Sequence, residues 1–134
     1  MDTLGYIILT TVTEQEDIIA LLSQIYEDDN MYVIHIDAKD PDGASRLTKV
    51  LKQKYSGSNF EVISTQRITW GGFTMLLAEL DMLAVLLKME GNFKYVMNLA
   101  GDAALCLCTC VFADLAYWQQ LHFQSRQTNR SVRD

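Results

Sequence analysis

Asp37 is the first residue in the sequence whose type and position suggest chemistry. It directly follows the short apolar run Tyr32–Ile36, and a carboxylate at the end of a strand can accept hydrogen bonds from ribose hydroxyls. The structural alternative is a loop carboxylate that bonds only nearby backbone, and position alone does not decide between the two. His35, inside the same run, is better explained as a buried core imidazole than as a catalytic base.

The turn Trp70–Gly72 is the second candidate, because it precedes a long helical pattern. Backbone N–H groups at such a point can face an anionic or sugar ligand, glycine permits close approach, and the indole offers an apolar plate for a sugar ring. The alternative is a Gly-Gly turn that only starts the helix. The sequence contains no phosphate loop, no Gly-x-Gly-x-x-Gly, no His-Glu-x-x-His and no Cys-x-x-Cys pair.

The elements that must hold these candidates alternate between short apolar runs and helical patterns. Runs rich in β-branched residues predict strands at 6–12, 32–36, 60–63 and 95–99. Helical spacing predicts helices at 13–28, 40–55 and 73–90. A capping box from Thr13 to Glu16 is expected to begin the first helix, and Asp40 before Pro41 is expected to cap the second. Such alternation predicts an α/β, Rossmann-like parallel sheet with helices on both faces.

Ligands of open α/β sheets bind beyond the carboxyl ends of the strands. In this chain those ends are residues 10–13, 37–39, 69–72 and 101–102, so these are the positions where a site is expected.

Composition excludes several classes of protein. The 134 residues are 49% hydrophobic with a single Pro, which fits one domain with a buried core. A net charge of −6 disfavours a nucleic-acid partner. No apolar stretch approaches the roughly 18 residues of a membrane span, and the first residues lack the basic start of a signal peptide. Three Cys, an odd number, disfavour a secreted disulfide framework.

The order of the motifs resembles one family. The segments His-Ile-Asp-x-Lys at 35–39, Trp-Gly-Gly at 70–72 and Leu-Ala-Gly-Asp at 99–102 are similar to those of the core-2/I-branching β-1,6-N-acetylglucosaminyltransferases and the related protein xylosyltransferases. The similarity covers roughly residues 5–102. It implies a GT-A-like glycosyltransferase domain, of which this chain is the nucleotide-binding half, and inverting transfer from a UDP-sugar.

The resemblance also implies roles for particular residues. Thr11, Val12 and Asp37 would contact the uridine. The nucleotide-sugar and acceptor cleft would be lined by residues from two turns, namely Trp70, Gly71, Gly72, Gly101 and Asp102. Branching-type members work without the metal-binding Asp-x-Asp motif, and Asp28-Asp29 lies in a turn remote from the strand ends. We therefore expect no metal and no cofactor, only a UDP-GlcNAc or other UDP-sugar donor.

Two departures from the family pattern limit the functional prediction. Gly101 is followed directly by Asp102, without the intervening residue and later Pro usual in the family. Family members also continue well beyond this length, and that part supplies the catalytic carboxylate and the basic residues for the diphosphate. The catalytic residues are therefore unassigned. The predicted function is a truncated transferase, inactive alone, whose full-length form transfers N-acetylglucosamine to an O-glycan acceptor.

The segment 103–134 reads differently from the rest and is predicted to be a divergent tail, out of frame or alternatively spliced. Suitable codons would let a shifted frame give a Pro-containing, family-like continuation. Cys106, Cys108 and Cys110 would share one face of a strand, but without a fourth ligand nearby they favour buried small apolar side chains over a soft-metal site.

Partners and location follow from the resemblance. The implied partners are a UDP-sugar donor and a glycan or glycoprotein acceptor. The full-length family implies a type II Golgi membrane protein, although this chain shows neither anchor nor signal. Two alternatives remain: a protein xylosyltransferase-like enzyme, or a non-catalytic nucleotide-binding or regulatory α/β module. Affinity for UDP would separate the last from the other two.

Overall fold

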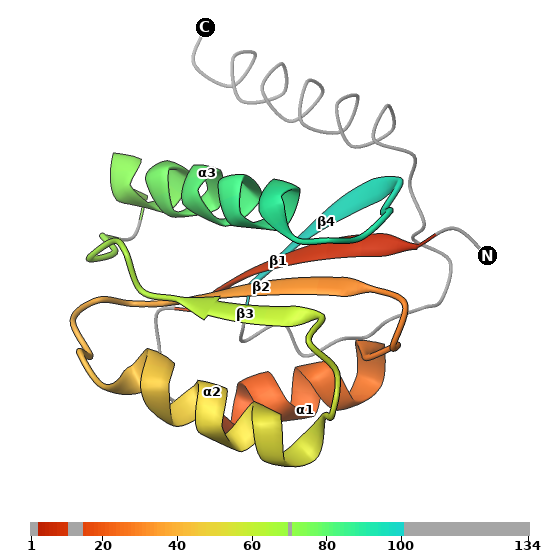
Figure 1. Ribbon diagram of the computed structural model, residues 1–134. Coiled ribbons are helices and arrows are strands. Elements are labelled where there is room, and N and C mark those ends of the chain that lie inside the picture. Colours follow the sequence, from red (N-terminus) through yellow and green to blue (C-terminus); the bar gives the residue numbers. More distant parts are fainter. Residues whose placement is uncertain (1–2, 11–14, 70, 101–134) are drawn as a thin grey trace, which may run out of the picture.

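The computed structural model describes residues 3–10, 15–69 and 71–100, and these form one parallel sheet with helices on both faces (Figure 1). The elements alternate along the chain in the order β1 (Leu4–Thr10), α1 (Gln15–Ile25), β2 (Met31–Ile36), α2 (Gly43–Lys54), β3 (Phe60–Ile63), α3 (Phe73–Lys88) and β4 (Tyr95–Ala100). The strands lie in the order β3-β2-β1-β4 and every pair is parallel. The predicted Rossmann-like α/β fold is confirmed.

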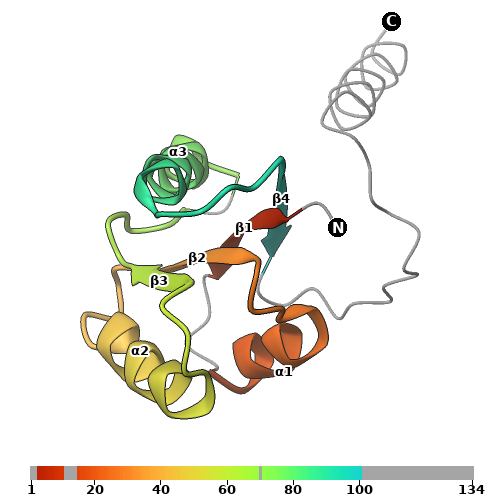
Figure 2. The same ribbon diagram turned by 45° about the vertical axis from the view of Figure 1, so that its right-hand side comes forward.

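Two apolar clusters hold the layers together, one on each face of the sheet. Helices α1 and α2 cover one face and α3 covers the other (Figures 1 and 2). Side chains of β1 alternate between them, so that Tyr6 and Ile8 pack toward α1 and α2 while Ile7 and Leu9 pack toward α3. Burial on both faces explains why β1 and β2 read as continuous apolar runs rather than alternating ones.

Helix α3 packs directly against β1 at Gly5. A Cβ atom at this position would lie 2.8 Å from Cδ2 of Leu86 and 3.2 Å from the ring of Phe93. A side chain at this position would have to displace the side chains of Leu86 and Phe93, and Leu86 is fully buried.

Element boundaries depart from the prediction at β1, which begins at Leu4 rather than at residue 6, and at two helices. Helix α1 ends at Ile25 rather than near residue 28, because the backbone N–H of Glu27 donates to the Tyr32 hydroxyl at 2.8 Å. Helix α2 begins at Gly43 with Asp42 at the N-cap position. The prediction that Asp40 caps α2 is wrong: its carbonyl accepts the Gly43 N–H in a turn before the helix, and its carboxylate pairs with Arg46. Thr13, which opens the predicted capping box, lies outside the described residues.

The order of the strands reverses between β1 and β4. Strands β1, β2 and β3 step in one direction, and β4 then returns to the opposite side of β1. In register, Thr10 of β1 lies beside Ile36 of β2, and Leu9 lies beside Ala100 of β4. The carboxyl ends of β1, β2 and β4 therefore lie at one edge of the sheet. This edge is next to the kind of switch point where doubly wound proteins bind ligands.

Candidate functional site

Asp37 stands immediately after β2 at this edge and is nearly buried, with 5% of its surface exposed. Its Oδ1 atom accepts backbone hydrogen bonds from Lys39 at 2.9 Å and from Ile68 at 3.2 Å. The carboxylate thus joins the end of β2 to the loop between β3 and α3. Its Oδ2 atom lies 3.8 Å from the ammonium of Lys39, an ion pair that leaves this oxygen with acceptor capacity.

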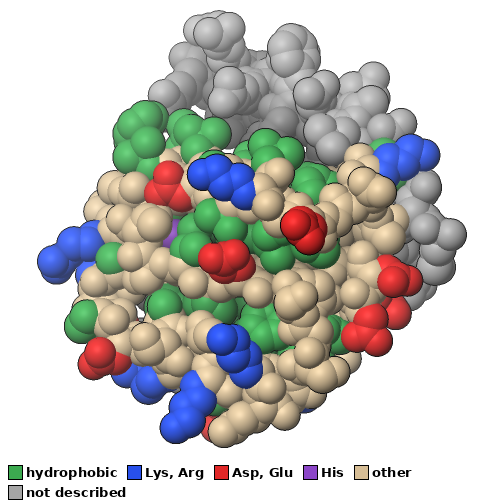
Figure 3. Space-filling view, in the orientation of Figure 1, with side chains coloured by type: hydrophobic (Ala, Val, Ile, Leu, Met, Phe, Trp, Pro, Cys, Tyr) green, Lys and Arg blue, Asp and Glu red, His purple; other side chains and the backbone are tan. Residues whose placement is uncertain are grey.

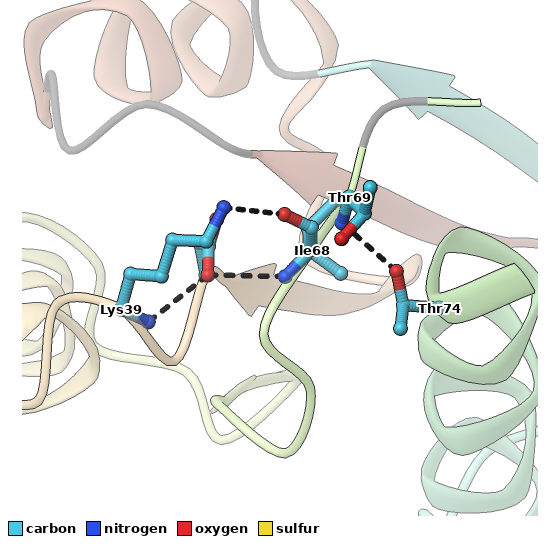
Figure 4. A network of polar contacts seen from close by, with 5 residues as sticks. Lys39, Ile68, Thr69 and Thr74 are labelled. Atoms are coloured by element: carbon cyan, nitrogen blue, oxygen red, sulfur yellow. Dashed lines mark hydrogen bonds and ion pairs between the residues drawn. The ribbon is translucent and has the colours of Figure 1, made fainter. Parts of the chain in front are cut away.

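Lys39 reinforces the same junction from the exposed side. Its Nζ donates to the Ile68 carbonyl at 2.6 Å, so that both backbone groups of Ile68 are bonded by the segment that follows β2 (Figure 4). The Ile68 side chain is itself buried in the α3-side cluster. A further backbone bond runs from the Ala38 N–H to the Gln66 carbonyl at 3.0 Å. The loop between β3 and α3 is therefore held firmly against the carboxyl end of β2.

The described part of the Trp-Gly-Gly turn begins α3. Gly71 adopts a left-handed conformation with φ of 69°, and Gly72 takes the N-cap position without a side-chain cap. The turn is closed by the bond from the Gly72 N–H to the Thr69 carbonyl at 2.9 Å. Thr74 of α3 accepts the Thr69 N–H at 2.8 Å through its hydroxyl (Figure 4). These bonds aim the helix N-terminus at the same edge as Asp37.

His35 and Asp81 hold the earlier part of this loop. His35 is fully buried, as the core-imidazole interpretation predicts, and its Nε2 accepts the backbone N–H groups of Thr65 at 3.2 Å and Gln66 at 3.1 Å. Burial lowers the pKa of His35 below its ordinary value. Asp81 of α3 accepts the Thr65 hydroxyl at 2.6 Å and the Gln66 amide at 3.0 Å, and these bonds lower the pKa of its carboxyl.

The structure describes three of the eight predicted site residues. Asp37, Gly71 and Gly72 all lie at the carboxyl edge, while the others, Thr11, Val12, Trp70, Gly101 and Asp102, lie outside the described residues. So do the three cysteines of the tail. Sequence reasoning did not single out Ile68 and Asp81, because hydrogen bonds between residues so distant in sequence leave no local pattern. Lys39 lies in the stretch 37–39, where a site is expected, but its sequence position assigns it no role of its own.

Residues 3–10, 15–69 and 71–100 contain neither a cluster of metal ligands nor a membrane-spanning helix. That part of the chain brings no three His, Cys, Asp or Glu side chains together as a metal site would. It also has no helix that combines the length and apolar character needed to cross a bilayer.

The family follows from comparison with known proteins. A family model described as Core-2/I-Branching enzyme matches residues 4–127, which includes every described element and all the residues of the carboxyl edge. The chain belongs to this family. The match continues past residue 102, where the sequence suggested a boundary, and that division into two segments stays a prediction.

Three human glycosyltransferases show the similarity of this branching-enzyme chain. It is 32% identical over 100 residues, 75% of the chain and 23% of the relative, to Probable beta-1,3-galactosyl-O-glycosyl-glycoprotein beta-1,6-N-acetylglucosaminyltransferase 7. It is 30% identical over 101 residues, 73% of the chain and 25% of the relative, to N-acetyllactosaminide beta-1,6-N-acetylglucosaminyl-transferase. To Beta-1,3-galactosyl-O-glycosyl-glycoprotein beta-1,6-N-acetylglucosaminyltransferase it is 34% identical over 82 residues, 60% of the chain and 19% of the relative. The chain thus spans a quarter or less of these relatives.

Proposed function

We propose that this chain is the donor-binding part of a branching-type β-1,6-N-acetylglucosaminyltransferase and binds the UDP portion of UDP-GlcNAc at the carboxyl edge of the sheet. One observation carries the proposal. The strand order reverses between β1 and β4, and Asp37 and the Gly71-Gly72 turn lie at the edge where such a reversal favours nucleotide binding. We take the class of nucleotide from the resemblance to branching enzymes, a family to which the chain belongs.

Asp37 is the residue whose geometry supports this role most clearly. Its Oδ1 atom is occupied by two backbone N–H groups, which fixes the orientation of the carboxylate. Its Oδ2 atom lies 3.8 Å from the ammonium of Lys39. We assign Oδ2 to a hydrogen bond from the uridine, and we assign further uridine contacts to Thr11 and Val12. A fixed acceptor binds a nucleoside with little loss of side-chain entropy.

The turn at the start of α3 has the second role in this proposal. Trp70, Gly71 and Gly72 line the nucleotide-sugar cleft together with Gly101 and Asp102. N–H groups in the first turn of a helix favour an anionic ligand, so the uncapped Gly72 fits this role.

The chemistry proposed for the whole enzyme is inverting transfer of N-acetylglucosamine to an O-glycan acceptor. A carboxylate acts there as general base on the acceptor hydroxyl. We assign that base to the part of the relatives that this chain does not span, and we propose that the chain alone is inactive. We further propose that transfer is independent of metal and that the full-length enzyme resides in the Golgi membrane. These points rest on the family resemblance.

Titration with UDP tests the proposal. The wild-type chain should bind UDP saturably, and Asp37→Asn should weaken binding about tenfold because it replaces or reorients the acceptor oxygen. Asp42→Asn is the matched control, since Asp42 is an exposed carboxylate whose side chain makes no cap hydrogen bond. Equal loss in both variants, or no binding by the folded wild type, would refute the assignment. Added EDTA should leave the wild-type affinity unchanged.

A further inference from the structure

The segment 64–72 between β3 and α3 is held at its start by two side chains from different elements. Nε2 of His35, in β2, accepts the backbone N–H groups of Thr65 and Gln66 at 3.2 and 3.1 Å. Oδ2 of Asp81, in α3, accepts the side-chain donors of the same two residues at 2.6 and 3.0 Å. Backbone and side chains of Thr65 and Gln66 are therefore held from both flanks, an arrangement we term the loop clamp.

The loop clamp is continuous with the proposed donor site. The carbonyl of Gln66 accepts the Ala38 N–H at 3.0 Å, next to Asp37 in the chain. Two residues further on, Ile68 bonds the Asp37 carboxylate, and the Thr69–Gly72 turn follows directly. A displacement of Thr65 and Gln66 would therefore change both the turn and the partners of Asp37.

We propose that His35 and Asp81 are positioning residues that fix residues 64–69 before the Gly71-Gly72 turn, so that the donor site is fully formed only while His35 is neutral. The connection to donor binding rests on the proposed function. The clamp itself rests on the four hydrogen bonds above.

The neutral state follows from the hydrogen-bond pattern. An Nε2 atom that accepts two N–H groups carries no proton, so the proton of the neutral ring is on Nδ1. Protonation would turn Nε2 into an N–H donor that faces the N–H groups of Thr65 and Gln66, and both hydrogen bonds would break. Asp81 from α3 and Asp37 from the end of β2 are the charged groups that act on the ring, and both favour its protonated form. Burial has the larger effect and lowers the pKa of His35.

Tryptophan fluorescence provides a readout of the clamp that requires no ligand. The chain has two Trp residues, Trp70 and Trp118, so a Trp118→Phe background leaves one reporter inside the segment 64–72. In this background Asp81→Ala should increase acrylamide quenching of Trp70 at pH 7.5 and weaken UDP binding about tenfold. Glu79→Ala, a change of another α3 carboxylate, should alter neither quantity. Asp81 is only partly buried, so its replacement should leave the core intact.

The pH profile separates positioning from a merely structural role. Quenching of Trp70 should rise on acidification with a midpoint below about pH 6.5. His35→Gln should keep the loop held at pH 7.5, because its side-chain oxygen accepts N–H groups, and should abolish the transition. Asp81→Asn, which retains an acceptor but removes the charge, should move the midpoint lower.

Two results would overturn the inference: unchanged quenching in Asp81→Ala, or a transition that persists in His35→Gln. Failure of the proposed function looks different. A clamp that responds as expected in a chain that binds no UDP would refute donor binding and leave the clamp established.

Discussion

The backbone N–H of Ile68 donates to the carboxylate of Asp37 at 3.2 Å, across 31 residues of sequence. Lys39 bonds the carbonyl of the same Ile68, so one buried residue of the loop is secured by two side chains that follow β2. The carboxylate proposed to bind uridine is therefore also a structural support. Loss of nucleotide affinity at this position must be judged against stability.

Asp37→Ala should destabilise the chain by about 1–3 kcal/mol, because the buried Ile68 N–H loses its acceptor. Urea denaturation measures the change. Asp42→Ala, at an exposed position whose side chain makes no cap bond, should remain within about 0.5 kcal/mol of wild type. Equal stability of the two variants would show that the Asp37 bonds contribute nothing to the fold.

The stability of the chain should fall as pH decreases below about 6.5, with His35 as a contributor. Burial lowers the pKa of His35 in the folded state, so the unfolded chain binds this proton more readily. The contribution is complete above the ordinary pKa and declines as pH falls toward the folded-state value. Thermal unfolding between pH 5 and 8 should show a flatter profile in His35→Gln. His122→Gln, a change of the second histidine, is the control.

Neighbouring leucines of α3 should respond very differently to truncation. Leu86 is 0% exposed and contacts the Gly5 position, whereas Leu87 is 74% exposed. Leu86→Ala should reduce the free energy of unfolding by about 2–5 kcal/mol and Leu87→Ala by less than about 0.5 kcal/mol. Similar losses in chemical denaturation would mean that α3 packs on the sheet through another face.

Exposed apolar side chains gather along the outer side of α3, as Figure 3 shows over the upper part of the molecule. They include Phe73, Leu76, Leu80 and Leu87. Replacing Leu80 and Leu87 by Lys should raise solubility with little loss of stability, because more than half of each residue is exposed to solvent. Light scattering during concentration tests this, with unfolding curves as the control.

Gly71→Ala should destabilise the turn before α3 by about 1–2 kcal/mol, since φ of 69° is unfavourable for a side chain with Cβ. Space is not the cause, because nothing lies within 4 Å of a Cβ built there. Gly71→Asn should be milder, as Asn tolerates this conformation better. Hydrogen exchange of the amides at the start of α3 would reveal local loosening that global unfolding curves miss.

The fold was predictable because its signals are local. The β-branched runs of β1 and β2 and the helical spacing of α3 are visible in the sequence, and alternation implied the parallel sheet. The start of α2 was misjudged because Asp40 has the residue type of a cap but pairs with Arg46 instead. Only the folded structure shows such a competing partner.

The positions of the candidate site residues could be predicted from the sequence, but the hydrogen bonds that join them could not. Asp37 and the Gly71-Gly72 turn were found by their place at element ends. The bonds of Ile68, and those of Asp81 to Thr65 and Gln66, depend on how β2, α3 and the loop pack together. No spacing rule relates residues brought together in that way.

The most direct test of the central claim is to map backbone amide shifts of the ¹⁵N-labelled chain during titration with UDP. Saturable shifts are expected at residues 37–39 and 68–72, with a Kd of about 1 mM or tighter. Amides at the opposite, amino-terminal edge of the sheet, such as those of Tyr6 and Tyr32, should not move. Shifts centred on that edge, or none in the folded chain at saturating UDP, would contradict a donor site at the carboxyl ends of the strands.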